Sequence, residues 1–518
     1  MGDESLKDTV AAGYQFEGPA LELGALVLGA EELTDAHVRI PIGMLNRHGL
    51  VAGATGTGKT KTLQLMAEQL SAAGVPVFAA DIKGDLTGLS TFGKADDKLT
   101  ARAASVGQTW TATAFPVEYF ALGGQGTGIP LRVTMSAFGP TLLSKVLGLN
   151  ETQESSLGLI FHYADSAGLP LLDLADLREV TKFLTSEEGK AALTDLGGLS
   201  KATTGVILRE LIAFSDQGAD AFFGEPEFES RDLLRTTPSG KGLINLVELP
   251  NLVDRPAIFS TFLMWLLADL FHDLPEVGDP DKPTLVFFFD EAHLLFEDAS
   301  KAFLESIAQT VRLIRSKGVG VFFVTQSPTD VPDDVLAQLG SRIQHQLRAH
   351  TPNEAKALKA TVNTYPTSGY DDLGQVLTSL GIGEAVVTVM NERGAPTPVA
   401  WTRLRAPESL MGPADAAAMS AAVQASALQP KYAATVDRES AREILAGKLE
   451  AGAAKAQAEQ AGAPAPATPS APKAPAPRAR KTKDKSVVEE VMGSTAFRQV
   501  LRTAAREVVR GVFKTGRR

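Results

Sequence analysis

Short runs of consecutive apolar residues recur along this chain, and helical periodicity fills several of the intervals between them. The runs occupy residues 75–81, 242–249, 285–290, 319–326 and 385–390. Because apolar residues follow one another in these runs without polar alternation, the runs indicate parallel strands that are buried on both faces. Helical spacing at 254–273 and 301–317 would supply crossover connections. The pattern predicts an α/β fold with a doubly wound, mainly parallel sheet.

The same pattern divides the chain into a core, an insertion and terminal segments. Residues 96–240 interrupt the core between its second and third strands and are mostly helical in pattern, with strand candidates near 115–120 and 131–135. The expected segments are a small β preface (1–45), the first part of the core (46–95), the insertion (96–240), the second part of the core (241–405), a helical C-terminal extension (406–460), an Ala/Pro-rich linker (461–485) and a basic amphipathic helix (486–518).

The predicted C-terminal helix differs in charge from the rest of the chain. From residue 471 onward, 13 Lys and Arg oppose 4 Asp and Glu, so this end carries +9 while the remainder of the −11 chain carries −20. The helix could bind anionic lipid, nucleic acid or a partner helix, or it could pack on a neighbouring core. The acidic body argues against a large outer surface for nucleic acid, but it is compatible with a basic channel inside a ring.

The composition limits the chemistry and the compartment. The chain contains no Cys, so it has no disulfide, thiolate nucleophile or Cys-based metal site, and a reducing cytoplasm is the expected location. The charged N-terminus lacks the apolar core of a signal peptide. The most apolar segment, 259–271, contains Asp269 and is shorter than the roughly 20 residues of a membrane span. We expect a buried helix there.

Residues 53–60 form a complete phosphate-binding loop, Gly-Ala-Thr-Gly-Thr-Gly-Lys-Thr, of the form G-x-x-x-x-G-K-[ST]. A strand candidate at 48–52 precedes it and a helical pattern at 62–70 follows it, so the phosphates would lie at a helix N-terminus. Lys59 can reach the β- and γ-phosphates, and Thr60 can place its hydroxyl on Mg²⁺. Nucleotide contacts are expected from Gly53, Ala54, Thr55, Gly56, Thr57, Gly58, Lys59, Thr60 and Lys61.

An acidic pair follows the apolar run that begins at residue 285. A carboxylate at a strand end beside a phosphate loop can hold Mg²⁺, which suits Asp290. The next carboxylate, Glu291, can act as the general base that polarises water for attack on the γ-phosphate.

Together with Ala292 and His293, the acidic pair also matches the D-E-A-H sequence of the acidic box in superfamily-2 helicases. We reject that assignment because the chain lacks their other motifs and their second core; His293 could couple nucleotide to helix position or be structural.

Further polar positions extend the candidate site. Gln326 follows the next strand and can sense the γ-phosphate or orient the attacking water, unless it only caps a turn. Arg315 ends a helix, where its positive charge would interact favourably with the helix dipole. It could instead reach across a subunit boundary as an arginine finger, and Arg312 and Arg342 are alternative fingers. Asp81 ends the second strand, where a site role and turn capping are equally compatible. Because the chain lacks an Asn-Lys-x-Asp signature for guanine, ATP is the expected nucleotide.

Together these motifs resemble the HerA/FtsK group of P-loop ATPases and, more closely, its bacterial YjgR-like branch. The resemblance is carried by residues 53–60, 81–85, 290–293, 315–328, 330–336, 431–432 and 437–441 and by the basic C-terminal helix. It implies a RecA-like P-loop core that hydrolyses ATP with Mg²⁺, in a homo-oligomeric, hexameric ring whose sites lie between subunits. In that site Lys59 and Thr60 would contact phosphates and Mg²⁺. Asp290 would bind Mg²⁺, Glu291 would be the base, Gln326 the sensor and Arg315 the finger in trans.

The resemblance leaves two functions to consider. HerA and FtsK move double-stranded DNA through the ring, which suggests a motor for DNA translocation or remodelling. Only about 50 residues precede the phosphate loop, fewer than HerA's N-terminal β-barrel needs, and FtsK's membrane spans and winged-helix reader have no counterpart here. The alternative is an ATPase that acts on a protein or a membrane-associated substrate, similar to those of type IV secretion. The acidic body and the basic C-terminal helix favour it.

Overall fold

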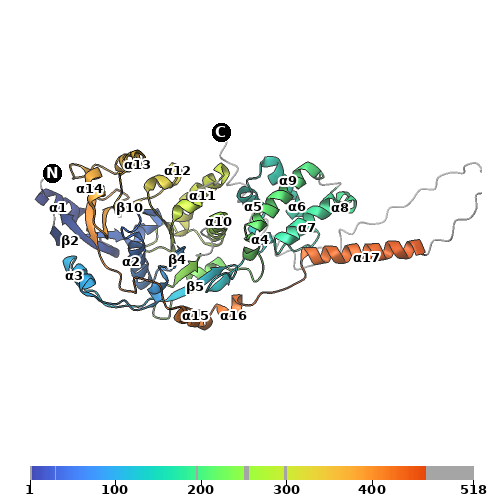
Figure 1. Cartoon of the computed structure of the whole chain (residues 1–518), viewed down its shortest axis with the longest axis horizontal. Helices are drawn as coiled ribbons and strands as arrows, with labels where there is room; N and C mark the ends of the chain where they lie inside the picture. Colours follow the sequence, from blue (N-terminus) through green and yellow to red (C-terminus); the bar gives the residue numbers. More distant parts are fainter. Residues whose placement is uncertain (1–2, 30, 194–196, 250–255, 297–299, 462–518) are drawn as a thin grey trace, which may run out of the picture.

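The computed structural model describes residues 3–461, with gaps at 30, 194–196, 250–255 and 297–299. Nearly all of the predicted linker and all of the predicted basic helix lie outside these residues. The described chain forms a long sheet flanked by helices, and a group of helices gathers at one end of the long axis (Figure 1).

One 12-stranded sheet organises the molecule, in the order β2-β1-β12-β11-β10-β3-β9-β8-β4-β7-β5-β6. Neighbouring strands from β10 to β6 run parallel, whereas those from β2 to β10 run antiparallel. The predicted α/β class with a mainly parallel sheet is therefore confirmed. The strands are β1 (Ala20–Leu28), β2 (Glu31–Pro41), β3 (Gly49–Ala52), β4 (Val77–Asp81), β5 (Val117–Leu122), β6 (Ile129–Leu131), β7 (Ile244–Glu248), β8 (Leu285–Phe289), β9 (Val319–Thr325), β10 (Ser341–Gln344), β11 (Glu384–Thr388) and β12 (Ala400–Leu404).

Many of the helices begin at a side chain that accepts a hydrogen bond from the first turn. Such N-caps satisfy backbone N–H groups that have no partner within the helix. Asp96, Asn150, Asp173, Ser186 and Ser200 cap α3, α6, α7, α8 and α9 in this way. The helices are α1 (Asp3–Gly13), α2 (Lys59–Ala72), α3 (Asp97–Ser105), α4 (Met135–Phe138), α5 (Pro140–Val146), α6 (Glu151–Ser166), α7 (Leu174–Thr185), α8 (Glu187–Ala192), α9 (Lys201–Asp216), α10 (Pro256–Asp273), α11 (Lys301–Ile314), α12 (Asp333–Leu336), α13 (Pro352–Val362), α14 (Leu373–Ser379), α15 (Ala416–Ala425), α16 (Gln429–Tyr432) and α17 (Ala441–Ala461).

Helix α10 contains the segment for which a buried helix is predicted. Phe262, Leu266 and Leu270 are fully buried within the main core. None of the described helices has the length and apolarity needed to span a membrane.

The prediction of a parallel strand at 385–390 is wrong. β11 lies between β10 and β12 and is antiparallel to both. Both of its faces are nevertheless buried, because Val387 faces the main core while Val386 packs with Leu347 and Leu377 in a smaller cluster. Burial on two sides produces the continuous apolar run, whichever way the strand points.

The β preface and the insertion both contribute strands to the same sheet. β1 and β2 pair with each other and join the sheet through β12. Within 96–240, β5 pairs with β7 and β6 pairs with β5, so the sheet continues into the insertion. The helices α5–α9 lie beyond that end of the sheet, with α17 beside them (Figure 1).

The C-terminal extension contacts both the core and the insertion. The Ser409 N–H donates to the buried carboxylate of Glu68 on α2 at 3.0 Å. Farther along, Lys431 Nζ pairs with Asp232 at 2.9 Å, and the Tyr432 hydroxyl donates to the same carboxylate at 2.6 Å. The motif at 431–432 therefore holds the extension against the end of the insertion.

Candidate functional site

The phosphate-binding loop connects β3 to α2, as the sequence predicts. Lys59 is the first residue of α2, and Gly58 immediately before it has φ = 114°, which favours glycine. Backbone hydrogen bonds from Gly53 N to Thr325 O (3.2 Å) and from Ala54 N to Gln346 O (2.8 Å) fix the start of the loop between β9 and the segment after β10. The loop therefore lies at the carboxyl ends of three adjacent parallel strands, the edge at which α/β sheets bind ligands.

A buried histidine supports this loop from behind. A Cβ atom at Gly53 would lie 2.4 Å from the Cβ of His345, so only glycine fits there. His345 Nε2 lies 2.9 Å from Thr62 Oγ1 on α2, and its ring is completely buried. Burial and the positive charge of Lys59 lower the pKa of His345 to about 3, so the ring is neutral at physiological pH. His345 is thus a rigid, uncharged support for the loop.

The loop offers several groups that suit a polyphosphate. The N–H groups of Thr55, Gly56 and Gly58 donate no hydrogen bond to any of the described residues. The first turn of α2 adds further free N–H groups, because those at the start of a helix have no acceptors within it. The Lys59 ammonium lies on the loop itself and donates to the carbonyls of Gly53 (2.6 Å) and Ala54 (3.2 Å). Free amides, a cation and the positive end of a helix dipole together bind an anion.

The acidic pair lies beside the loop, at the end of β8. Asp290 is 3% exposed, and its Oδ1 accepts a hydrogen bond from Glu291 N at 2.9 Å. Glu291 adopts a left-handed backbone conformation (φ = 48°), which is uncommon for a residue other than glycine and turns the chain sharply away from the strand. Such strained residues occur often at functional sites.

Glu291 is held by a lysine that the sequence analysis did not single out. Lys83 Nζ pairs with Glu291 Oε1, while among the described residues Glu291 Oε2 is buried without a hydrogen-bond partner. His293 Nδ1 lies 3.4 Å from that free oxygen. Burial by itself raises the pKa of Glu291, but Lys83 outweighs it and leaves that pKa lowered. The carboxylate of Glu291 is therefore ionised.

Asp81 caps a turn. Its two carboxylate oxygens accept hydrogen bonds from Gly84 N and Leu86 N, both at 2.8 Å. The turn after β4 is thereby fixed, and it presents Lys83 to the acidic pair. The strands β4 and β8 are parallel neighbours in register, with Ala80 opposite Phe289, which brings their carboxyl ends together.

Gln326 lies at the same edge of the sheet. It is exposed and lines a cavity of about 420 Å³ together with His293, Phe296 and Asp330. Asp330 anchors the strand end by accepting hydrogen bonds from Thr325 Oγ1 (2.7 Å) and Ser327 N (2.9 Å). The structure therefore places Gln326 next to His293, and through it near Glu291.

Thr60 and Asp290 are the residues that could hold Mg²⁺. Within the described ranges, no group of three or more His, Asp or Glu side chains could hold a metal ion by itself. One carboxylate and one hydroxyl still suit Mg²⁺, which is usually bound by one or two carboxylates together with substrate phosphates and water. Burial, followed by the charge of Glu291, raises the pKa of Asp290 to about 6, so a nearby cation would stabilise its ionised form.

The three arginines predicted as fingers do not join this site, whereas Arg348, which the sequence analysis did not single out, donates to the carbonyl of Thr55 in the loop at 3.3 Å. Arg315 precedes β9, whereas the phosphate loop contacts the far end of that strand. A seven-residue strand is about 20 Å long. Arg315 therefore lies too far away to reach the phosphate loop of its own chain.

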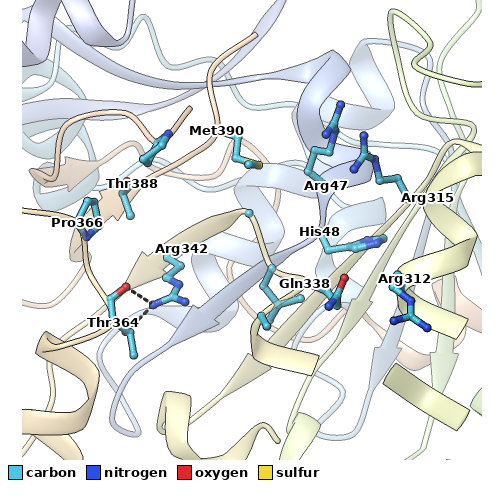
Figure 2. A pocket seen from close by; sticks show the side chains of 14 residues that line it. Arg47, His48, Arg312, Arg315, Gln338, Arg342, Thr364, Pro366, Thr388 and Met390 are labelled. Atoms are coloured by element: carbon cyan, nitrogen blue, oxygen red, sulfur yellow. Dashed lines mark hydrogen bonds between the residues drawn. The ribbon is translucent and has the colours of Figure 1, made fainter. Parts of the chain in front are cut away.

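Instead, four arginines line a pocket of about 460 Å³ at the amino ends of the strands (Figure 2). They are Arg47, Arg312, Arg315 and Arg342. Arg47 and Arg315 share a single carboxylate, that of the exposed Asp279, at 3.2 and 3.5 Å. Arg342 donates to the carbonyl of Thr364 at 3.0 Å. Among the residues that the structure describes, Asp279 is the one carboxylate paired with these four guanidinium groups, so the pocket is positive.

A second buried histidine supports this pocket. His48 Nδ1 accepts a hydrogen bond from Val321 N at 3.1 Å, so Nε2 carries the proton. Burial, together with the charges of Arg315 and Arg47, lowers the pKa of His48 to about 4. His48 is therefore neutral and supports the pocket as an uncharged, buried ring.

Comparison with known proteins supports the fold and the family. Two curated relatives are described as DNA double-strand break repair helicase HerA. The protein from Sulfolobus acidocaldarius is 23% identical over 359 residues, covering 68% of this chain and 64% of the relative. The protein from Sulfurisphaera tokodaii is 22% identical over 370 residues, covering 70% and 66%. The chain thus spans slightly less than two-thirds of the length of these relatives.

The structure is also similar to the plasmid coupling protein TrwB. The complex of TrwB with ADP and Mg²⁺ has a TM-score of 0.51 at 17% identity, covering 79% of this chain and 95% of TrwB. Its complex with the GTP analogue GDPNP has a TM-score of 0.52 at 16% identity, covering 80% and 95%. This likeness confirms the predicted RecA-like P-loop fold.

The family itself is shown by a match that extends over most of the chain. The model of the helicase HerA-like C-terminal family matches residues 27–518, from the β preface to the last residue. This chain therefore belongs to the HerA-like C-terminal family.

Proposed function

We propose that this protein is a Mg²⁺-dependent ATPase and that it forms a ring-shaped motor acting on double-stranded DNA. The proposal is carried by one observation: the phosphate loop, Asp290 and Glu291 lie together at the carboxyl edge of the parallel strands. His345 packs so closely behind the loop that only glycine fits at position 53. Pre-positioned amides and cations are what phosphoryl transfer requires, because its catalysis is mostly positioning and charge stabilisation.

Binding and chemistry are assigned to different residues of this edge. The loop amides and Lys59 would bind the β- and γ-phosphates, and Thr60 and Asp290 would hold Mg²⁺. Mg²⁺ supplies positive charge that offsets charge developing on the phosphate oxygens. Glu291 would accept the proton of the attacking water through the carboxylate oxygen that is free of Lys83. Gln326, at the exposed side, would orient that water.

The position of the arginines supports the proposed ring. Arg348 donates to the carbonyl of Thr55 in its own loop at 3.3 Å, whereas Arg315 lies a full strand length from that loop and could act as a finger only on the site of a neighbouring subunit. The amino-edge pocket of one subunit would then face the carboxyl edge of the next. Arg315 is the proposed finger, with Arg312 and Arg342 as the alternatives lining the same pocket.

DNA is proposed as the substrate because both curated relatives are described as DNA repair helicases. We expect linear double-stranded DNA to raise the rate of ATP hydrolysis severalfold, and the effect to decline as salt rises, because phosphate contacts release counterions. The measurement is the steady-state rate with and without DNA at several stated salt concentrations. The Lys59→Ala variant, which should lose hydrolysis under all conditions, controls for a contaminating ATPase.

The same experiment addresses the alternative substrate. If ATP hydrolysis is present but DNA does not change its rate even at low salt, the motor acts on a protein or at a membrane, as the acidic body and basic C-terminal segment would favour. If Lys59→Ala and the unmodified chain have equal rates, the ATPase assignment itself is wrong.

A further inference from the structure

The ion pair between Lys83 and Glu291 joins a fixed turn to the proposed general base. Lys83 is 46% exposed, whereas the side chain of Glu291 is 9% exposed. The turn that carries Lys83 is fixed by the two hydrogen bonds to Asp81, and Gly84 in this turn has φ = 75°. The pairing is therefore built from two rigid elements, the β4 turn and the strained end of β8, which are parallel neighbours in the sheet.

This pairing works against proton transfer. A carboxylate that accepts a charge-assisted hydrogen bond from a lysine has much of its negative charge satisfied, and it is a weaker base for water. Within the described part of the chain, no other charged group of the site takes over the role of Lys83 at Glu291 Oε1. Lys59 donates its hydrogen bonds to loop carbonyls, and His293 lies near Glu291 Oε2. Glu291 thus has one engaged and one free oxygen.

A second carboxylate lies in the same turn as Lys83. Asp85 follows two residues later in the same turn and is partly exposed. The charge of Asp85 contributes, after that of Glu291 and Asp290, to raising the pKa of Lys83 against the opposing effect of burial. A long, half-exposed lysine side chain between two carboxylates can exchange one for the other by a rotamer change, without any movement of the strands.

We propose that Lys83 is a positioning residue that restrains Glu291. Paired with Lys83, Glu291 is a weak base; when Lys83 moves to Asp85, both oxygens of Glu291 become available. The proposal rests on the proposed ATPase function and adds to it a control over the base. It limits futile hydrolysis until the motor engages its substrate.

The direct test measures hydrolysis by the full chain. Lys83→Ala should raise the rate without DNA about threefold or more, leave KM for ATP within about threefold, and reduce the additional stimulation by DNA. Lys83→Arg, which keeps the charge and can pair with Glu291, should restore the low rate. Lys98→Ala, at an exposed position of α3, is the matched control and should change nothing. A tenfold or greater loss of kcat in Lys83→Ala would show that Lys83 acts on the reacting phosphate instead, and an unchanged kcat would show that the pair has no role.

A second measurement tests the pair without hydrolysis. In a double-mutant cycle on thermal unfolding of the nucleotide-free full chain, Lys83→Ala and Glu291→Gln should be non-additive, with a coupling of about 1–2 °C in Tm. Additive shifts would overturn the pairing. This measurement does not depend on enzymatic activity. If the two substitutions are coupled but the unmodified chain does not hydrolyse ATP, the ion pair is confirmed and the ATPase proposal is wrong.

Discussion

The two edges of the parallel strands carry opposite chemistry on the same scaffold. At the carboxyl edge, two carboxylates, two lysines and a set of free backbone amides surround the phosphate loop. At the amino edge, four arginines line one pocket and share little negative charge. Each edge is supported by one fully buried neutral histidine, His345 at the first and His48 at the second.

The proposed ring would make use of this difference. The carboxyl edge carries the loop amides, Lys59 and Glu291, and it also has an arginine, Arg348, which donates to the carbonyl of Thr55 in the loop at 3.3 Å. The amino edge has arginines in excess and, among the described residues, only Asp279 as a partner for Arg47 and Arg315. Contact between the two edges of adjacent subunits would satisfy both, because an anion at one edge meets guanidinium groups at the other.

The largest expected effect is the loss of kcat when the proposed arginine finger of the amino edge is removed. Arg315→Ala should lower kcat by about 10³–10⁵-fold, the range for an arginine finger, while the affinity for ATP changes little. The measurement is steady-state hydrolysis, together with nucleotide binding by equilibrium titration. Arg209→Ala, an exposed arginine on α9, is the matched control.

Mixing experiments separate action in trans from action in cis. Inactive Arg315→Ala subunits mixed with inactive Glu291→Gln subunits should recover some activity, because an intact site can then form from one edge of each. No recovery at any ratio, with assembly confirmed, would contradict the contact between edges. The same assay on Arg312→Ala and Arg342→Ala shows which guanidinium serves as the finger.

Removing the base tests the carboxyl edge in the same way. Glu291→Gln should lower kcat by about 10²–10⁴-fold, because the amide cannot accept the proton of the attacking water. ATP should still bind, since the loop amides and Lys59 are unchanged. Glu179→Gln is the control, because Glu179 pairs with Lys182 at 2.7 Å on α7, within the insertion. Full activity of Glu291→Gln would remove Glu291 from the chemistry.

What could be predicted from the sequence depends on how local the signal is. The strand, loop and helix around residues 53–60 are encoded within about twenty positions, and the structure confirms them. Asp290 and Glu291 were found for the same reason, because a carboxylate directly after an apolar strand is a local pattern. Their catalytic roles remain predictions.

The features that the sequence did not reveal depend on strand order and register. Lys83 meets Glu291 only because β4 and β8 are neighbours in register, across 208 positions of sequence. The pocket at the amino edge requires β3, β9 and β10 to be adjacent, which brings Arg47, Arg315 and Arg342 together. The direction of β11 is likewise a property of the sheet, because burial on both faces gives the same apolar run in either direction.

The smallest expected effect is on the pH dependence of the free energy of unfolding, and it comes from the two buried histidines. It tests whether protonation destabilises the two edges equally. Both rings are neutral in the folded protein, with the pKa of His48 at about 4 and that of His345 at about 3, against about 6.5 when unfolded. At these two histidines the unfolded chain therefore binds more protons below pH 6.5, and their contribution to the free energy of unfolding should fall as pH decreases from 6.5 toward 4. Asp290 and Glu68, whose pKa values are raised to about 6 and about 7, contribute in the opposite direction, so the histidine share is measured by comparing variants.

The His48→Asn variant isolates the amino edge's share of this effect. The side-chain oxygen of Asn can accept a hydrogen bond from Val321 N, and Asn does not titrate. The backbone at position 48 (φ = 61°, ψ = 172°) is strained for His and Asn alike, so the comparison at several pH values cancels this strain. Relative to the unmodified chain, the variant should lose less stability between pH 6.5 and 4, by an amount of about 3 kcal/mol from the shift in pKa. Chemical denaturation at several pH values measures it. A pH dependence identical to that of the unmodified chain would mean that His48 is hydrated or mobile, and that the amino edge is less rigid than the carboxyl edge.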